Sequence, residues 1–173
     1  MKKLRIILSI IFIIIAMAVV SLTLGRDLIL QKQPGLNSFA IINFAGYLFF
    51  ILLPVEALVP YYLAEGHSFL VVSGVAIVTG LLAQFVDYAI GITVSKKTIY
   101  TLVSKRKYDK AKKYIDMYGN ATIFFFNFFP ISSPIVVLAA GMTRHNMNQT
   151  MFFSFLGLLG KYTIICLIVL GII

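Results

Sequence analysis

The sequence predicts an all-α integral membrane protein with about three full transmembrane helices, two opposed re-entrant helical hairpins that form an inverted repeat, and an interfacial amphipathic helix. Three observations lead to this prediction. Of the 173 residues, 60% are hydrophobic and only 12% are charged, which is about half the charged share of an ordinary soluble domain. Several apolar runs are long enough to cross a bilayer. Two further apolar runs are interrupted by prolines in a similar way.

The first apolar run extends from Ile6 to Gly25 and carries no charge. It is long enough to span a hydrocarbon core of about 30 Å. Basic residues precede it, as in a signal peptide, but the apolar part is too long and no clear small-residue cleavage site follows. Residues 1–34 are therefore expected to form a transmembrane helix and a connection, followed by one membrane domain at 35–173.

Residues 36–66 and 118–143 are each predicted to form a helical hairpin that enters and leaves the membrane by the same face. Both contain two prolines and then close with Leu-Ala-x-Gly. Proline removes a backbone donor and disfavours helix continuation, and paired interruptions in two halves of a chain point to the substrate site of a repeat-built transporter. The residues expected to break the hairpins are Pro54, Pro60, Pro130, Pro134, Gly66 and Gly141.

The remaining elements are two spans and one amphipathic segment. Residues 69–95 and 150–173 are expected to be membrane-spanning helices, with glycines that allow close helix approach in a bilayer. Residues 96–117 form the basic segment that is expected to lie at the membrane interface.

Positive charge gathers at three places, which are the N-terminus, the 96–118 segment and the 143–149 loop. Because positive charge marks cytoplasmic loops, these places are expected to face the cytoplasm in a multi-pass protein of the cell (plasma) membrane. The basic run from Lys96 to Lys113 flanks apolar spans. We therefore expect it to contact anionic lipid headgroups rather than nucleic acid. A homo-oligomer is compatible with the sequence.

Three charges fall inside predicted spans or hairpins, namely Glu56, Asp87 and Lys161. Such charges are costly in a membrane, so each is a functional candidate. A carboxyl group at the hairpin tip, at Glu56, is hard to ionise and suits proton coupling. Alternatively, Glu56 caps backbone donors, Asp87 pairs with Lys161 to fix geometry, and Lys161 snorkels to an interface instead of holding an anionic headgroup.

Four further polar residues lie at hairpin depth and are expected to line the path of a proton or substrate: Asn43, Asn127, Ser132 and Ser133. Most polar residues in such places simply satisfy backbone groups or neighbouring helices. The motifs of metalloproteases, α/β-hydrolases and nucleotide-binding proteins are absent from the sequence, as is Cys/His spacing for a metal. We therefore expect no enzyme activity, no metal and no cofactor.

Four elements, in order, resemble the DedA family, also called the VTT or SNARE-associated Golgi protein domain. Pro54-Val55-Glu56 with Gly66 resembles its Pro-Gly-Glu/Asp…Gly element, and Gly80…Asp87-Tyr88…Gly91 resembles its Gly…Asp…Tyr…Gly helix. Phe125-Phe126-Asn127…Pro130…Ser133…Gly141-Met142…Phe152 is similar to its Phe-x-Arg…Pro…Arg…Ala-Gly…Met…Phe block. Gly160-Lys161 looks like the Gly-Lys of a smaller, divergent branch. The resemblance covers roughly residues 35–173.

The resemblance implies a core of two facing re-entrant hairpins and movement of lipids between leaflets, including polyprenyl-phosphate carriers with proton coupling. Asn127 and Ser133 stand where the family has arginines, and Asn43 is the polar residue nearest to an acid that the family carries upstream. Since arginine pairs bidentately with phosphate, these departures put a polyprenyl-phosphate substrate in doubt. Lys161 is the membrane-embedded cation left to substitute.

The expected function is therefore that of a small lipid transporter of the flippase or scramblase type. A non-transporting membrane scaffold or assembly factor is the alternative, with the basic segment as its docking surface. Convergence of Glu56, Asp87 and Lys161 on a hydrated cavity would favour transport, whereas dry packing of the hairpin tips would favour scaffolding.

Overall fold

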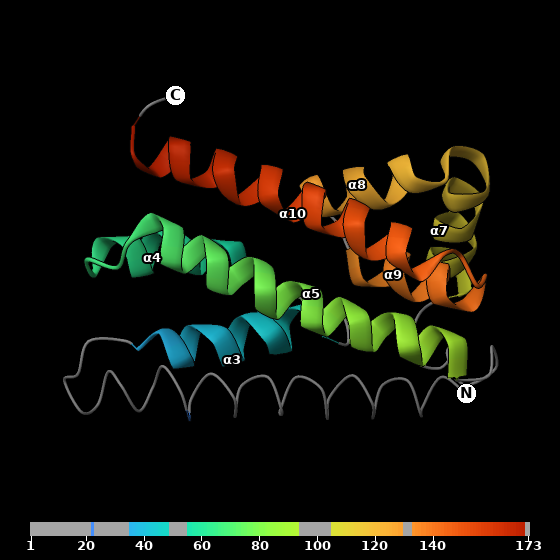
Figure 1. Cartoon of the computed structure of the whole chain (residues 1–173), viewed down its shortest axis with the longest axis horizontal. Coiled ribbons are helices and arrows are strands. Elements are labelled where there is room, and N and C mark those ends of the chain that lie inside the picture. The colour runs from blue at the N-terminus through green and yellow to red at the C-terminus, as the bar shows by residue number, and fades with distance from the viewer. Residues whose placement is uncertain (1–21, 23–34, 49–54, 94–104, 130–132, 172–173) are drawn as a thin grey trace.

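A computed structural model describes residues 22, 35–48, 55–93, 105–129 and 133–171 (Figure 1). This part of the chain is helical and contains no strand, which confirms the all-α expectation for the residues described. The predicted first span, at 6–25, lies outside them apart from residue 22, as do Pro54, Pro130, Ser132, Lys96 and Lys97.

The first hairpin consists of α3 (Leu36–Tyr47), the short 3-10 helix η2 (Val55–Ala57) and α4 (Leu58–Ala64). Its two arms run antiparallel. The rings of Phe39, near the start of α3, and Tyr62, near the end of α4, lie 4.9 Å apart between centroids. At the other end, Gly46 faces Val55 so closely that a Cβ on Gly46 would lie 2.2 Å from the Val55 side chain.

Gly66 ends α4 in a left-handed conformation, with φ of +89°. The backbone N–H of Gly66 donates to the carbonyl oxygen of Leu63, and that of His67 donates to that of Tyr62. Glycine favours this turn because it has no Cβ to oppose a positive φ. The expected role of Gly66 at the end of the hairpin therefore has a direct conformational basis, and the long helix α5 (Phe69–Thr93) starts three residues later.

The second half begins with α7 (Lys105–Tyr118), which includes the described part of the predicted basic segment. It continues with α8 (Asn120–Phe128), α9 (Ser133–Met142) and α10 (Met147–Val169). The side chain of Asn120, at the start of α8, bonds His145, just beyond the end of α9, at 2.7 Å. The arms α8 and α9 therefore also run antiparallel.

The two long helices run antiparallel and contact each other along the centre of the bundle (Figure 1). Ser73 of α5 contacts Cys166 of α10 at 3.5 Å. A Cβ on Gly80 of α5 would lie 3.4 Å from Leu158 of α10. Along this contact, residue numbers therefore decrease on α10 as they increase on α5. This register determines which polar side chains of the two helices lie close together.

Both arms of the second hairpin pack closely against a long helix, α9 against α5 and α8 against α10. A Cβ on Gly91 of α5 would lie 2.4 Å from the carbonyl oxygen of Leu138 of α9. One on Gly157 of α10 would lie 2.6 Å from the carbonyl oxygen of Phe124 of α8. Small residues at such crossings let helix backbones pack closely. In a bilayer such packing drives helices together, because lipid tails are as apolar as the side chains and supply no hydrophobic driving force.

Three of the expected hairpin breaks need correction. Pro60 is the third residue of α4 and Pro134 the second of α9. Both lie in a first turn, where the missing N–H would have had no intrahelical acceptor. These two prolines therefore begin helices and do not interrupt them. Gly141 lies inside α9, and Arg144, with φ of +54°, takes the left-handed turn position in the second half.

The last helix starts at Met147, three residues before the predicted start at 150. The side chain of Asn146 caps it by accepting a hydrogen bond from the backbone N–H of Gln149 at 3.1 Å. Asparagine is a favoured capping residue because its side-chain oxygen satisfies a free donor of the first turn. The earlier start follows from this cap, which the apolar pattern does not reveal.

Two described helices, Phe69–Thr93 and Met147–Val169, are long and apolar enough to cross a membrane, with mean hydropathies of 2.2 and 2.0. Their outward faces carry large exposed apolar side chains. On α5 these are Leu70, Val71, Val78, Leu82, Phe85 and Ile92, and on α10 Phe152, Phe155, Leu159, Ile164, Ile168 and Val169. Exposed apolar surface of this extent fits a nonpolar surrounding better than water.

Candidate functional site

The candidate site is an ion pair between the first hairpin and the last helix. Lys161 Nζ of α10 lies 3.0 Å from Glu56 Oε1 of η2. The lysine side chain is 4% exposed and the glutamate 20%. Lys161 is the sole cation within the described parts of the two hairpins and two long helices. The site therefore joins a deeply buried charge to a carboxylate that retains partial access to the surroundings.

Tyr47, the last residue of α3, completes the ion pair. Its hydroxyl donates to Glu56 Oε1 at 3.3 Å and accepts from Lys161 Nζ at 3.2 Å. The ammonium also lies 5.5 Å from the centroid of the Tyr47 ring, within the range of a cation–π contact. An ammonium has three donors, and two of them have partners here.

A chain of neutral groups extends inward from Tyr47. The hydroxyls of Tyr47 and Tyr162 lie 3.2 Å apart, and Tyr162 donates to Asn43 Oδ1 at 3.2 Å. Asn43 Nδ2 then donates to the carbonyl oxygen of Ala76 at 2.9 Å and to the Thr79 hydroxyl at 2.8 Å. The charged pair is thus tied through α3 to the middle of α5.

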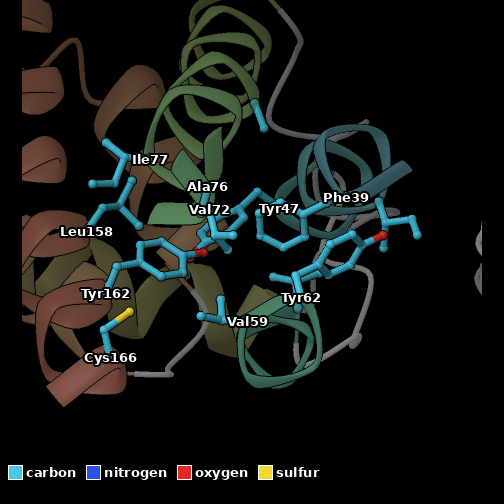
Figure 2. Packing of buried hydrophobic residues seen from close by; sticks show 13 residues of the cluster. Phe39, Tyr47, Val59, Tyr62, Val72, Ala76, Ile77, Leu158, Tyr162 and Cys166 are labelled. Atoms are coloured by element: carbon cyan, nitrogen blue, oxygen red, sulfur yellow. The ribbon is translucent and has the colours of Figure 1, made fainter. Parts of the chain in front are cut away.

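Apolar packing fixes this polar chain in place. Figure 2 shows the Tyr162 ring directed toward Tyr47, with Val72 and Ala76 of α5 beside them. Tyr47 is 4% exposed and Tyr162 fully buried. Buried hydroxyl groups need partners because an unsatisfied polar group in an apolar setting is costly. The network therefore holds both tyrosines in one arrangement.

Asp87 does not belong to this site, and the expected pairing of Asp87 with Lys161 is wrong. In the antiparallel register, Ser73 lies opposite Cys166 and Gly80 opposite Leu158, which places Lys161 near residue 77 of α5. Asp87 is ten positions further along, or roughly 15 Å at the rise of an α-helix. Asp87 is buried in the second half of the bundle, so Glu56, Asp87 and Lys161 do not converge. The convergence of all three that was expected to favour transport is therefore not found.

The second half has a neutral polar cluster of its own, around Asn127 of α8. Asn127 Nδ2 donates to the carbonyl oxygen of Ile123 at 3.0 Å and to the Ser154 hydroxyl at 3.2 Å. Its Oδ1 accepts from Gln84 Nε2 of α5. All three side chains, Asn127, Ser154 and Gln84, are fully buried. Asn127 therefore links three helices, α8, α5 and α10.

The other candidate residues from the sequence lie in different parts of the structure. Asn43 and Asn127 are buried in separate networks, one in each half. Ser133 is buried at the first position of α9, and Ser132 lies outside the described residues. Sequence analysis missed Tyr47, Tyr162 and Gln84, which occupy the centre of the two networks. A sequence signal did exist for them, since each is a polar-tipped residue within an apolar run.

Chemically, the site is a buried cation whose anionic partner is a carboxylate. Glu56 Oε1 accepts from both Lys161 and Tyr47, so its carboxylate occupies the position that a phosphate oxygen could take. Lysine binds phosphate as a point charge. No group of three or more His, Cys, Asp or Glu residues that could hold a metal is found among the described residues.

Comparisons of the chain with protein-family models, with curated proteins and with solved structures found no match.

Proposed function

We propose that the chain is a multi-pass membrane protein that moves a phosphate-bearing lipid, of the phospholipid or polyprenyl-phosphate type, between leaflets. The observation that carries this proposal is the buried Lys161 neutralised by Glu56 of a hairpin. A buried ion pair is weak evidence for stability, whereas ionisable groups inside membrane helices mark substrate and ion pathways. The resemblance to the DedA family, with its two facing hairpins, supports the same function.

Membrane insertion is supported by α5 and α10, which are long enough to span and expose large apolar side chains. The basic helix α7 and the 143–149 turn lie at the same end of the bundle, because Asn120 contacts both His145 and Gln149. The 65–68 turn lies directly before the start of α5, at the other end of the bundle. Positive charge thus gathers at one end, which we propose is cytoplasmic in the plasma membrane.

The proposed mechanism is competition between Glu56 and a lipid phosphate for Lys161. When Glu56 is ionised, it holds Lys161 and Tyr47 and the site is closed by an internal carboxylate. When Glu56 takes up a proton, its negative charge is lost, and Lys161 and Tyr47 can receive an anionic headgroup. Proton uptake by Glu56 and headgroup binding would then be coupled, since the ionised Glu56 and the headgroup compete for the same ammonium group.

Exchange of labelled phospholipid between leaflets of proteoliposomes tests the proposal. Lys161→Met is expected to slow exchange of an anionic lipid roughly ten- to hundred-fold, because a hydrogen bond to a charged group contributes about 1.5–3 kcal/mol. Glu56→Gln should also change the rate and remove its dependence on pH. Asp87→Asn should have a smaller effect, because Asp87 lies away from the pair.

The matched control is Lys112→Met. Lys112 pairs with Asp116 on α7, but both side chains are exposed, at 42% and 53%. This variant removes the same charge from an ion pair at the surface, so exchange should not change. Rates that are unaffected by both Lys161→Met and Glu56→Gln would eliminate the assigned roles. Failure to exchange any lipid tried would count against transport itself.

A membrane scaffold is the second candidate, and the exposed face of α7 favours it. Tyr108, Ala111 and Ile115 of α7 are buried, while five cations face outward: Lys105, Arg106, Lys107, Lys110 and Lys113. The hydrogen bond from Lys112 to Asp116 raises the pKa of that lysine, so it too stays charged. Such a surface fits anionic headgroups, at about 1 kcal/mol for each Lys or Arg near the membrane.

Replacing these five exposed cations by glutamine is expected to remove most of the anionic lipid that the chain retains when purified from mixed neutral and anionic bilayers. The buried face of α7 is untouched, so the fold should persist. Lipid quantified by mass spectrometry per mole of protein is the measurement. If retention falls while leaflet exchange is unchanged, docking and transport are separate properties. Unchanged retention would show that α7 does not bind the headgroups.

A further inference from the structure

The two halves of the chain repeat one arrangement of helices. In each, two short antiparallel helices lead through a tight turn into a long helix, as α3–α4–α5 and as α8–α9–α10 (Figure 1). The two turns have the same hydrogen bonds. The backbone N–H of His67 donates to the carbonyl oxygen of Tyr62, and that of Gly66 to that of Leu63. In the same way, the backbone N–H of His145 donates to the carbonyl oxygen of Ala140, and that of Arg144 to that of Gly141. Gly66 and Arg144 each stand three residues before their long helix and have positive φ.

An asparagine holds the same place in each half. Asn43 lies seven residues after the first residue of α3, and Asn127 lies seven residues after the first residue of α8. Each uses Nδ2 to bond the long helix of its own half, Asn43 at Ala76 and Asn127 at Ser154. Those two acceptors are also equivalent, since each lies seven residues after the first residue of its long helix.

The opposite long helix supplies the donor to each asparagine oxygen. Tyr162 of α10 donates to Asn43 Oδ1, and Gln84 of α5 donates to Asn127 Oδ1. Tyr162 and Gln84 both lie fifteen residues after the first residue of their helix. Three positions therefore match between the halves, namely the asparagine, its acceptor and its donor, although the acceptor and donor groups differ in kind. The match of these positions indicates a structural repeat, because each position lies on a different helix of its half or of the opposite half.

We infer that the two halves, α3–α4–α5 and α8–α9–α10, can move apart. Two equivalent hydrogen bonds, Tyr162 to Asn43 and Gln84 to Asn127, hold them together, and we call these bonds latches. Because α5 and α10 are antiparallel, the latches act at opposite ends of their contact. The levels of Ala76 and Gln84 on α5 differ by eight residues, or roughly 12 Å. Opening one latch should loosen one end of the bundle and leave the other closed. The inference goes beyond the proposed function, since it concerns the separation of the halves whatever the ligand.

The latches are unequal in strength. The first is reinforced by the neighbouring Glu56–Lys161 ion pair, which joins the first hairpin to α10 at the residue next to Tyr162. The second is neutral, and within the described part of the chain Gln84 Oε1 is buried with no hydrogen-bond partner. An ion pair adds a charge-assisted contact that a neutral amide lacks. The bond between Gln84 and Asn127 should therefore break more readily than the bond between Tyr162 and Asn43.

Cysteine labelling can test the latches one at a time. Native Cys166 is fully buried, lies one helical turn beyond Tyr162 and contacts Ser73 of α5, so it reports the first latch. Thr150 is fully buried and lies one turn before Ser154. Thr150→Cys in a Cys166→Ala background therefore reports the second. Reaction with N-ethylmaleimide in lipid nanodiscs, followed by mass spectrometry, gives a rate for each position.

Tyr162→Phe is expected to raise the labelling rate at Cys166 about fivefold, the effect of losing one neutral hydrogen bond, and to leave position 150 unchanged. Gln84→Leu should do the reverse. Gln84→Met serves if Gln84→Leu does not fold. The inference is overturned if each variant raises both rates alike, which would indicate general loosening, or if neither raises either rate. Transport is not measured, so a chain that moves no lipid can still give the expected pattern.

Discussion

Glu56→Gln is expected to destabilise the folded chain by about 3 kcal/mol, near the lower end of the cost of breaking a buried ion pair. The reason is the 4% exposure of Lys161, which leaves its ammonium without a counter-charge and unable to reach water. Lys161→Met should cost less, because Glu56 is 20% exposed and its carboxylate can regain solvent. Reversible unfolding in mixed detergent micelles measures both free energies.

The double variant Glu56→Gln with Lys161→Met completes the comparison. Replacing a buried ion pair by groups without charge is often neutral, so the double variant should be more stable than Glu56→Gln alone. The exposed pair on α7 is the control, and Lys112→Met should leave the unfolding free energy unchanged. If Glu56→Gln were as stable as the wild type, the ammonium of Lys161 would have another counter-charge or access to water.

Gly141→Ala and Gly91→Ala are the second pair of changes with a large expected effect. A Cβ on Gly141 would lie 2.3 Å from the carbonyl oxygen of Tyr88, and one on Gly91 2.4 Å from that of Leu138. Both obstacles are backbone atoms, so no side-chain rotation can relieve the clash. Overpacking of this kind costs about 1–3 kcal/mol, and α9 should dock less closely on α5.

Gly74→Ala is the matched control for these two changes, because it lies in the same helix as Gly91. A Cβ on Gly74 meets no heavy atom within 4 Å. Alanine is preferred to glycine in a helix by roughly 0.5–1 kcal/mol, so this variant should be as stable as the wild type or slightly more stable. Equal stability of all three alanine variants would show that the close crossing of α5 and α9 does not contribute to the fold.

Local chemistry in the sequence determined the helical class and the position of most helices. Long apolar runs, each with a single charged residue, predict α5 and α10 because a helix needs no partner to satisfy its backbone. The proline-containing segments predict two interrupted hairpins, and the structure forms helix pairs at both. The sequence also singled out Glu56 and Lys161, since a charge within an apolar run is unusual wherever it occurs.

Only the tertiary structure decided which of these groups meet. By sequence, Asp87 was the expected partner of Lys161. The antiparallel register of α5 and α10 separates these two by roughly 15 Å, and Glu56 is the partner instead. The same holds for Gly141, whose likeness to Gly66 predicts a turn although its role is close packing. A one-dimensional pattern gives the face of each helix, whereas the phase and depth at which two faces meet depend on packing between them.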